Sequence, residues 1–175
     1  PKVSGVTLEN GRFIPADIVV ANSDAANVYQ HLLSPTAQQR TKSAKKSLAK
    51  ATPSLSGFVI LQAMTGKTTD FEHHNVFFPE NYDAEFDSIF GIGKKVSPVA
   101  DPTIYICSPN DSKMVPEGNE SWFMLINAPR HDPTNGVDWS NPELKASYTE
   151  QILSTLSNRG FSTSDRTLWQ RTITP

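Results

Sequence analysis

The sequence predicts an α+β fold in which a mixed, largely antiparallel sheet carries helices on one face. Three observations support this prediction. Four apolar segments have the length of strands, two segments have helical periodicity with capping residues, and loops rich in Pro, Gly and Asn separate them. The chain has 175 residues, of which 37% are hydrophobic, and a mean hydropathy of -0.39. These values are ordinary for a soluble globular protein with a substantial core.

Residues 3–24 are expected to form a hairpin followed by a buried strand. Asn10-Gly11 favours a two-residue type I′ turn, because both central residues of that turn need positive φ. The run Ile18-Val19-Val20-Ala21 has four apolar residues without alternation. Such a run is typical of a strand that is covered on both faces.

The loop after this run is a candidate ligand site. Asn22, Ser23 and Asp24 can each cap a helix that we expect to continue to about Leu33. In open α/β sheets, ligands bind at the carboxyl end of such a strand, beside a helix N-terminus.

Four later segments are predicted strands, and both faces of each are mostly apolar. A sheet with one solvated face would alternate apolar and polar residues. One face is therefore expected to pack helices, while the other packs further protein or lines an apolar cavity. The four segments are residues 55–64, 74–78, 103–107 and 121–127.

Two later segments are predicted helices. Residues 82–90 repeat apolar side chains at helical spacing, with Asn81 near the start and Gly91 after the end. Residues 142–158 follow Asn141, which can cap them. Residues 166–172 are predicted to add a final strand.

Composition excludes several classes of protein. A net charge of -2 gives the chain no overall nucleic-acid signature. The single cysteine, Cys107, cannot form an internal disulfide and fits a reducing compartment. The sequence holds no apolar run of the roughly 18 residues that a transmembrane helix needs.

Residues 34–54 form a basic stretch without acidic residues. We expect either a solvated helix or loop, or a strip that contacts anionic lipid headgroups. Nucleic acid is a weaker candidate partner, because no aromatic residues are interleaved. The basic residues are Arg40, Lys42, Lys45, Lys46 and Lys50.

Few residues could carry chemistry of their own. Adjacent residues on a strand point to opposite faces, so His73 and His74 are not expected to share a metal, and no metal site is predicted. Cys107 is expected to be buried and inert, and no catalytic residue is assigned. Gly91-Ile92-Gly93 lacks a third glycine and follows a helix, so it does not match a dinucleotide-binding loop.

The order of several motifs resembles the bacterial-type phytoene desaturases of the carotenoid desaturase family, which are flavoproteins with two dinucleotide-binding regions. The resemblance covers nearly the whole chain. Its motifs are Gly5-Val6-x-Leu8-x-Asn10-Gly11, Ala16-Asp17-x-Val19-Val20-x-Asn22-x-Asp24, His73-His74-Asn75-Val76-Phe77-Phe78, residues 82–90, residues 100–105, Val115-Pro116-Glu117-Gly118, residues 123–129 and residues 171–175.

The resemblance implies that two parts of the chain belong to different functional domains. Residues 1–24 would belong to or border the FAD-binding domain, and residues 25–175 would form one substrate-binding domain. Asn22, Ser23 and Asp24 would lie near FAD, whereas the Gly-rich motifs that hold the cofactor would lie outside this chain. We therefore expect a section of a longer protein that is inactive by itself and that self-associates through its apolar edges.

The resemblance also implies a function. The full-length enzyme would dehydrogenate a long apolar isoprenoid by hydride transfer to FAD, in the cytoplasm and peripherally at a membrane surface. The proposed acid–base residues of the family do not map onto this segment. An apolar cavity would hold the substrate, and its candidate lining residues are Phe58, Ile60, Phe77, Tyr105, Phe123 and Leu125.

Two alternatives remain open at the level of sequence. The same fold could serve a carotenoid isomerase, a ketolase, a retinol saturase or an amine oxidase. The chain could also be a non-catalytic module that binds an apolar ligand or a membrane.

Overall fold

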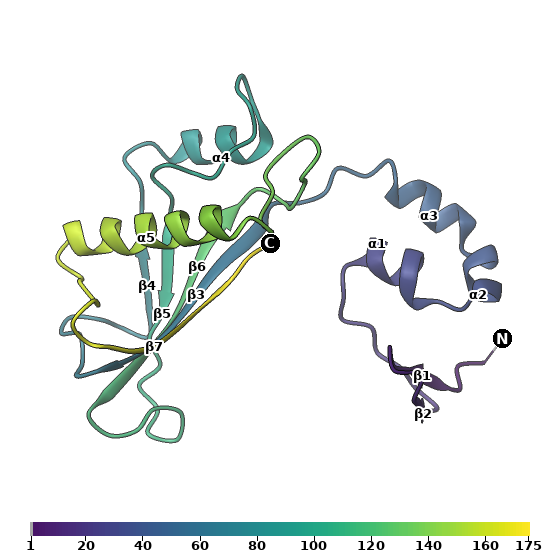
Figure 1. The fold of residues 1–175 in the computed structure, drawn as a ribbon, viewed down its shortest axis with the longest axis horizontal. Helices are drawn as coiled ribbons and strands as arrows, with labels where there is room; N and C mark the ends of the chain where they lie inside the picture. Colours follow the sequence, from purple (N-terminus) through teal and green to yellow (C-terminus); the bar gives the residue numbers. More distant parts are fainter. Residues whose placement is uncertain (1) are drawn as a thin grey trace. The chain divides into compact units, whose positions relative to one another are not determined.

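The computed structural model describes residues 2–175 and divides the chain into two compact units, one up to Pro53 and one from Ser54 to Pro175 (Figure 1). The boundary predicted between residues 24 and 25 separates an FAD-binding part from a substrate-binding part. It rests on the family resemblance and stays a prediction. In residues 2–175, no helix has both the length and the apolar character that crossing a membrane requires.

The first unit consists of a hairpin and a group of short helices. Asp24 begins the helical part, because its carboxylate accepts hydrogen bonds from the backbone N–H groups of Ala26 and Asn27. The predicted helix to about Leu33 is present, but its second half has π-helical hydrogen bonding. The elements are β1 (Gly5–Thr7), β2 (Phe13–Pro15), α1 (Ala25–Asn27), η1 (Val28–Leu32), α2 (Pro35–Arg40) and α3 (Lys42–Leu48).

The hairpin is confirmed, but its predicted turn type is wrong. Leu8 N–H bonds to the Arg12 carbonyl and Gly11 N–H bonds to the Leu8 carbonyl, which leaves a loop of three residues. Gly11 has φ +82°, whereas Asn10 has no positive φ. The three-residue loop closes with a glycine in the left-handed region, so only one of the two residues adopts the unusual conformation.

The predicted buried strand at residues 18–21 is also wrong for this chain. These residues have no strand assignment, and Ile18 and Val20 are 82% and 86% exposed. Apolar composition alone does not make a strand, because the backbone also needs a neighbouring strand to pair with. The hydrogen-bonded strand pair of the first unit consists of β1 and β2.

The second unit contains a five-stranded sheet in the order β4-β5-β6-β3-β7, and every pairing in it is antiparallel. The predicted α+β class with a largely antiparallel sheet is therefore confirmed. The elements are β3 (Ser56–Thr65), β4 (His74–Phe77), α4 (Tyr82–Phe90), β5 (Ile104–Cys107), β6 (Asn119–Ala128), α5 (Pro142–Asn158) and β7 (Thr167–Ile173).

Helices α4 and α5 begin and end at the predicted residues because their signals are local. The Asn141 side chain accepts hydrogen bonds from the first turn of α5, and Pro142 occupies the position where a missing N–H costs nothing. Asn81 caps α4 in the same way, and Gly91 ends it with φ +69°.

Helix α5 packs across one face of the sheet and forms the main core (Figure 1). Phe58 of β3 lies at its centre, with its ring edge-on to Tyr148 at a centroid distance of 4.9 Å and 5.3 Å from Trp139. The Trp139 indole N–H donates to the Pro129 carbonyl, so the polar atom of this buried side chain is paired. Burial raises the pKa of the Tyr148 phenol far above its usual value.

A buried carboxylate fastens α4 to the end of the sheet. Glu85 is 1% exposed and accepts hydrogen bonds from the Thr103 N–H, the Thr103 hydroxyl and the Asn127 amide. Thr103 precedes β5 and Asn127 is in β6. One side chain therefore holds three segments together, and three donors offset the cost of burying it.

We predict that the two sheet faces differ in their contribution to stability. Phe58→Ala should lower the free energy of unfolding by about 3–5 kcal/mol, because it leaves a cavity in the α5 core. Phe123→Ala, on the other face and 40% exposed, should cost only about 1–2 kcal/mol. Urea denaturation of both variants measures this difference, and equal losses would contradict the assignment of the faces.

Candidate functional site

The register of the strands divides the sheet into a core face under α5 and a second face, which we call the open face. Residues directly opposite each other on neighbouring antiparallel strands point to the same side. Tyr105 pairs with Leu125, which pairs with Val59, which pairs with Ile173. The open face consists of Gly57, Val59, Leu61, Ala63, Thr65, His74, Val76, Tyr105, Cys107, Asn119, Ser121, Phe123, Leu125, Asn127, Trp169, Arg171 and Ile173, with its polar residues mainly toward the ends of the strands.

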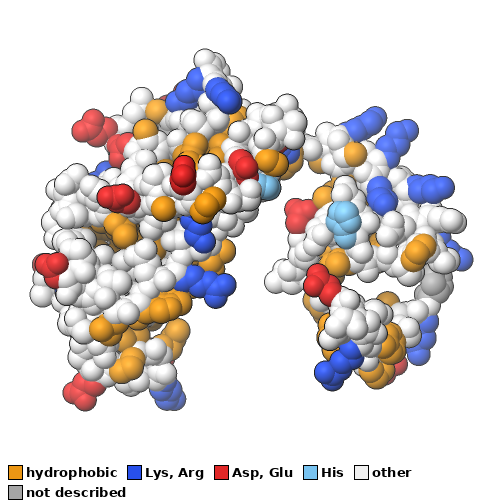
Figure 2. Space-filling view, in the orientation of Figure 1, with side chains coloured by type: hydrophobic (Ala, Val, Ile, Leu, Met, Phe, Trp, Pro, Cys, Tyr) orange, Lys and Arg blue, Asp and Glu red, His pale blue; other side chains and the backbone are white. Residues whose placement is uncertain are grey.

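The open face is largely apolar and partly accessible to solvent. Phe123, Val76, Trp169 and Ile173 are between 40% and 51% exposed, whereas Phe58 on the core face is fully buried. Figure 2 shows the opposite side of the second unit, with α5 in front, where some hydrophobic side chains also reach the surface. A contiguous apolar surface like that of the open face marks a site for an apolar ligand or for further protein.

The six predicted lining residues do not share one face. Tyr105, Phe123 and Leu125 lie on the open face. A single cavity cannot use both sides of a sheet, so only these three remain candidates for its wall. The other three lie on the core face, where Phe58 and Ile60 are fully buried under α5 and Phe77 packs against Phe71 and Phe161.

Curated relatives match this chain over most of its length. It is 37% identical over 147 residues, or 83% of the chain, to the 1-hydroxycarotenoid 3,4-desaturase of Flavobacterium sp. (strain P99-3). It is 29% identical over 180 aligned positions, or 99% of the chain, to the zeta-carotene-forming phytoene desaturase of Myxococcus xanthus. It is 30% identical over 91% of the chain to the 4,4'-diaponeurosporene oxygenase of Staphylococcus aureus (strain bovine RF122 / ET3-1).

This chain belongs to the carotenoid desaturase family. The resemblance found in the order of the motifs is thereby confirmed. The chain spans between 28% and 32% of the length of the three relatives named above. A comparison with models of known protein families gives no match.

The loop of residues 22–24, which we expect to lie near FAD, has a structural role in the first unit. The Asp24 carboxylate caps α1, and the Ser23 hydroxyl accepts a hydrogen bond from the Asn27 amide at 3.0 Å. Both side chains are exposed, as is Asn22. The three residues can contact a cofactor only as exposed polar groups beside a short helix, and their assignment to FAD stays a prediction.

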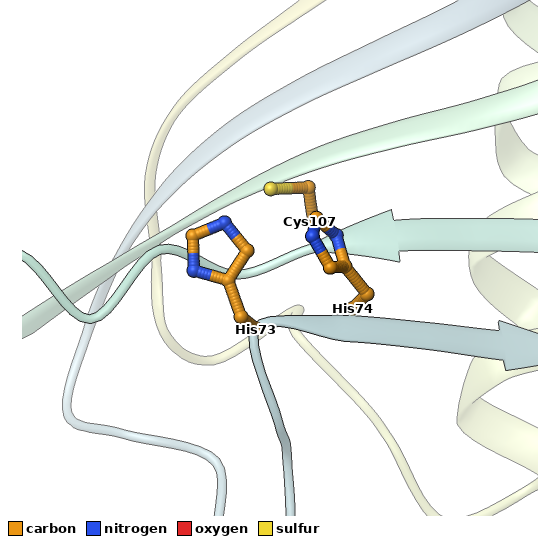
Figure 3. Close-up of side chains that lie close together, drawn as sticks. All are labelled: His73, His74 and Cys107. Atoms are coloured by element: carbon orange, nitrogen blue, oxygen red, sulfur yellow. The ribbon is translucent and has the colours of Figure 1, made fainter.

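A cluster of histidine and cysteine side chains lies at the edge of the open face. Ligand atoms of His73, His74 and Cys107 all lie within 4.8 Å of one another (Figure 3). The predicted separation of the two histidines is wrong, because β4 begins at His74 and His73 lies in a bend before it. The alternation of side chains in a strand does not apply to His73.

Tyr105 completes the surroundings of this cluster. Its hydroxyl is 2.8 Å from Nδ1 of His74, and its ring stacks on the His74 ring at a centroid distance of 5.9 Å. Desolvation raises the pKa of the Tyr105 phenol, and the neighbouring Cys107 adds to the increase. The hydroxyl therefore keeps its proton at neutral pH and can donate or accept a hydrogen bond.

Sequence reasoning missed this cluster because its third member comes from another strand. Cys107 is 33 positions after His74, and only the register of β4 against β5 places the two side chains opposite each other. The adjacent histidines were the one feature of the sequence that pointed to a metal site. Placing both of them on one strand led to the prediction that they face opposite sides.

Proposed function

We propose that the chain is the substrate-binding section of an FAD-dependent enzyme that dehydrogenates a long apolar isoprenoid. The observation that carries the proposal is the apolar open face in a member of the carotenoid desaturase family. Tyr105, Phe123 and Leu125 would form part of the wall against which the isoprenoid lies. Residues outside this chain would supply most of the cofactor site.

The chemistry assigns different tasks to the cofactor and to this chain. When a C–C single bond of the substrate becomes a double bond, bound FAD would accept a hydride, and the accompanying proton would leave to a base or water outside the residues assigned here. A wall of aromatic and aliphatic side chains holds the bond in place and excludes water. This task requires few titratable groups, in agreement with the row that contains Leu125, in which Tyr105 is the one polar side chain.

The residues present fit a limited role toward FAD. A pyrophosphate needs a Gly-rich turn that follows a strand and opens a helix. Gly91-Ile92-Gly93 instead follows α4, so it does not provide that turn. We assign Asn22, Ser23 and Asp24 to a contact beside the cofactor, and the Gly-rich turns to the remainder of the enzyme.

We predict that changes on the open face lower turnover of the isoprenoid without loss of the cofactor. In the full-length enzyme, Phe123→Ala and Leu125→Ala should each reduce kcat/KM about 10-fold, since each removes roughly 1–2 kcal/mol of apolar contact. The measurement is steady-state turnover of a carotenoid precursor in lipid vesicles, with flavin content determined by absorbance.

The matched control is Ile92→Ala, which removes an exposed apolar side chain from the loop after α4. It should leave kcat/KM unchanged. Normal turnover by both open-face variants, with flavin content intact, would contradict the proposed wall. Absence of FAD from the full-length protein would instead favour a non-catalytic module that binds apolar ligands.

A second candidate reaction is oxygenation, because one relative at 30% identity is named an oxygenase. Both reactions would need the same apolar wall, so the open face does not separate them. The mass of the product does, since dehydrogenation removes two hydrogen atoms per step and oxygenation adds oxygen. An amine substrate that turns over while polyenes do not would exclude both.

The basic stretch supports a further part of the proposal, namely peripheral attachment of the enzyme to the cytoplasmic side of a membrane. Figure 2 shows Lys and Arg side chains gathered over α2 and α3. Lys42, Lys45 and Lys46 belong to α3, and no acidic residue occurs between residues 34 and 54. Lys42 and Lys46 are exposed, whereas Lys45 is half-buried and donates to the Gln38 side chain. Each cation near an anionic bilayer contributes about 1 kcal/mol.

We predict that reversing these charges weakens binding to anionic vesicles. The triple variant Lys42→Glu, Lys45→Glu, Lys46→Glu should lower the partition coefficient by at least roughly 100-fold, which corresponds to about 3 kcal/mol. Sedimentation with phosphatidylserine-containing vesicles measures it, and added salt should weaken the wild type in the same direction. The double variant Lys94→Glu, Lys95→Glu, in the loop after α4, is the control; equal effects in both variants would overturn a specific role for α3.

A further inference from the structure

The cluster of His73, His74 and Cys107 combines ligand types that favour a particular class of metal ion. Imidazole nitrogens and a thiolate sulfur together bind borderline and soft cations such as Zn²⁺, and do not suit Mg²⁺ or Ca²⁺. Nothing in the apolar wall proposed above uses these three side chains. They come from two segments, the bend and start of β4 and the end of β5 (Figure 3).

The backbone brings two of the ligands close together. His74 and Cys107 are directly opposite each other, and Ser108 N–H donates to the His73 carbonyl at 2.9 Å. In antiparallel strands, a bond between the residue before one partner and the residue after the other means that the two partners do not bond to each other. His74 and Cys107 are therefore a non-hydrogen-bonded pair. Such pairs have the shortest distance between Cα atoms and hold their side chains close, with Cβ atoms about 4.5–5.5 Å apart.

The bend before β4 adds the third ligand. His73 and His74 have ring centroids 4.4 Å apart, with the planes at 70°. Both rings are exposed and Cys107 is half-buried. The side chains can therefore rotate about their χ angles without disturbing the core.

We propose that His73, His74 and Cys107 form a three-ligand site for a divalent transition metal, with Zn²⁺ as the ion that fits best. In a tetrahedral zinc site, bonds of about 2.0–2.3 Å place ligand atoms roughly 3.3–3.6 Å apart. The ligand atoms here lie within 4.8 Å of one another. Closure by roughly 1 Å, through rotation of exposed side chains, completes the geometry.

Tyr105 provides the outer contact that a metal-binding histidine requires. The second nitrogen of such a ring is almost always held by a hydrogen-bonding partner. The Tyr105 hydroxyl holds Nδ1 of His74 at 2.8 Å, which leaves Nε2 for the metal. In the bound form, Nδ1–H donates to the tyrosine oxygen.

Both imidazole rings are exposed, which gives a fourth coordination position access to solvent. A hollow also borders His73, although His74 and Cys107 are not part of its lining. It has a volume of about 770 Å³, and Glu72, His73, Ser108 and Asn110 contribute to its lining. Three protein ligands with one open position are the arrangement in which zinc keeps a water or takes a small anionic ligand. The site joins the bend before β4 to β5, so occupancy should also stabilise this edge of the sheet.

The inference does not depend on the desaturase activity, and metal binding alone tests it. Protein that contains this whole chain is titrated with Zn²⁺ by calorimetry and with Co²⁺ by absorbance, under reducing conditions. We expect one equivalent to bind, a thiolate-to-Co²⁺ charge-transfer band in the near ultraviolet, and a rise in the thermal midpoint with Zn²⁺.

Variants locate the ion. Cys107→Ser, a nearly isosteric change, should abolish the charge-transfer band and weaken Zn²⁺ binding at least 100-fold, as should His74→Asn. Tyr105→Phe should weaken it roughly 10-fold, since it removes only the outer contact. The control is His31→Asn, in η1 of the first unit, which should bind normally.

Two results would overturn the inference. One is the absence of a stoichiometric complex at micromolar Zn²⁺ concentrations. The other is an unchanged affinity in the Cys107→Ser and His74→Asn variants, which would place the ion elsewhere. The Co²⁺ spectrum of the unaltered protein reports the thiolate ligand directly, so the test does not rely on the folding of any variant.

Discussion

The packing of one long helix against one face of an antiparallel sheet is the constraint on which the remaining features depend. The strands carry apolar side chains on both faces, but an amphipathic helix has one apolar stripe. Helix α5 uses its stripe, with Tyr148, Ile152 and Leu156, to bury the face that contains Phe58. The opposite face is left with aromatic and aliphatic side chains that α5 cannot reach. Burial on one side thus creates a surface for recognition on the other.

The register then decides which side chains meet on that surface. Because paired residues of antiparallel strands share a face, each row across the sheet has its own chemistry. The row through Val76, Tyr105 and Leu125 is apolar apart from the phenol, whereas the neighbouring row begins with His74 and Cys107 before it reaches Phe123. The rim of the face is therefore polar and rich in metal ligands, and its interior is apolar.

Local signals in the sequence were sufficient for much of this fold. Asn141 and Asn81 cap α5 and α4, and their bounds follow from residues within one turn. The errors occurred where partners are distant. Residues 18–21 are apolar enough for a buried strand, but no property of the run itself supplies the strand that it must pair with. The lining residues were assigned to one cavity because composition does not show which face a helix will cover.

The polar rim and the apolar interior can coexist because β4 is an edge strand that starts at a bend. In the middle of a sheet, strict alternation would place His73 and His74 on opposite sides. At this edge, His73 lies in a bend just before β4 and does not have the extended backbone of a strand. Its side chain can therefore lie on the same side as that of His74. A cysteine sulfur and two imidazoles then gather at one edge of the face. A single bend thus brings a third potential metal ligand to the edge of the open face, and the pairing of the four other strands does not depend on it.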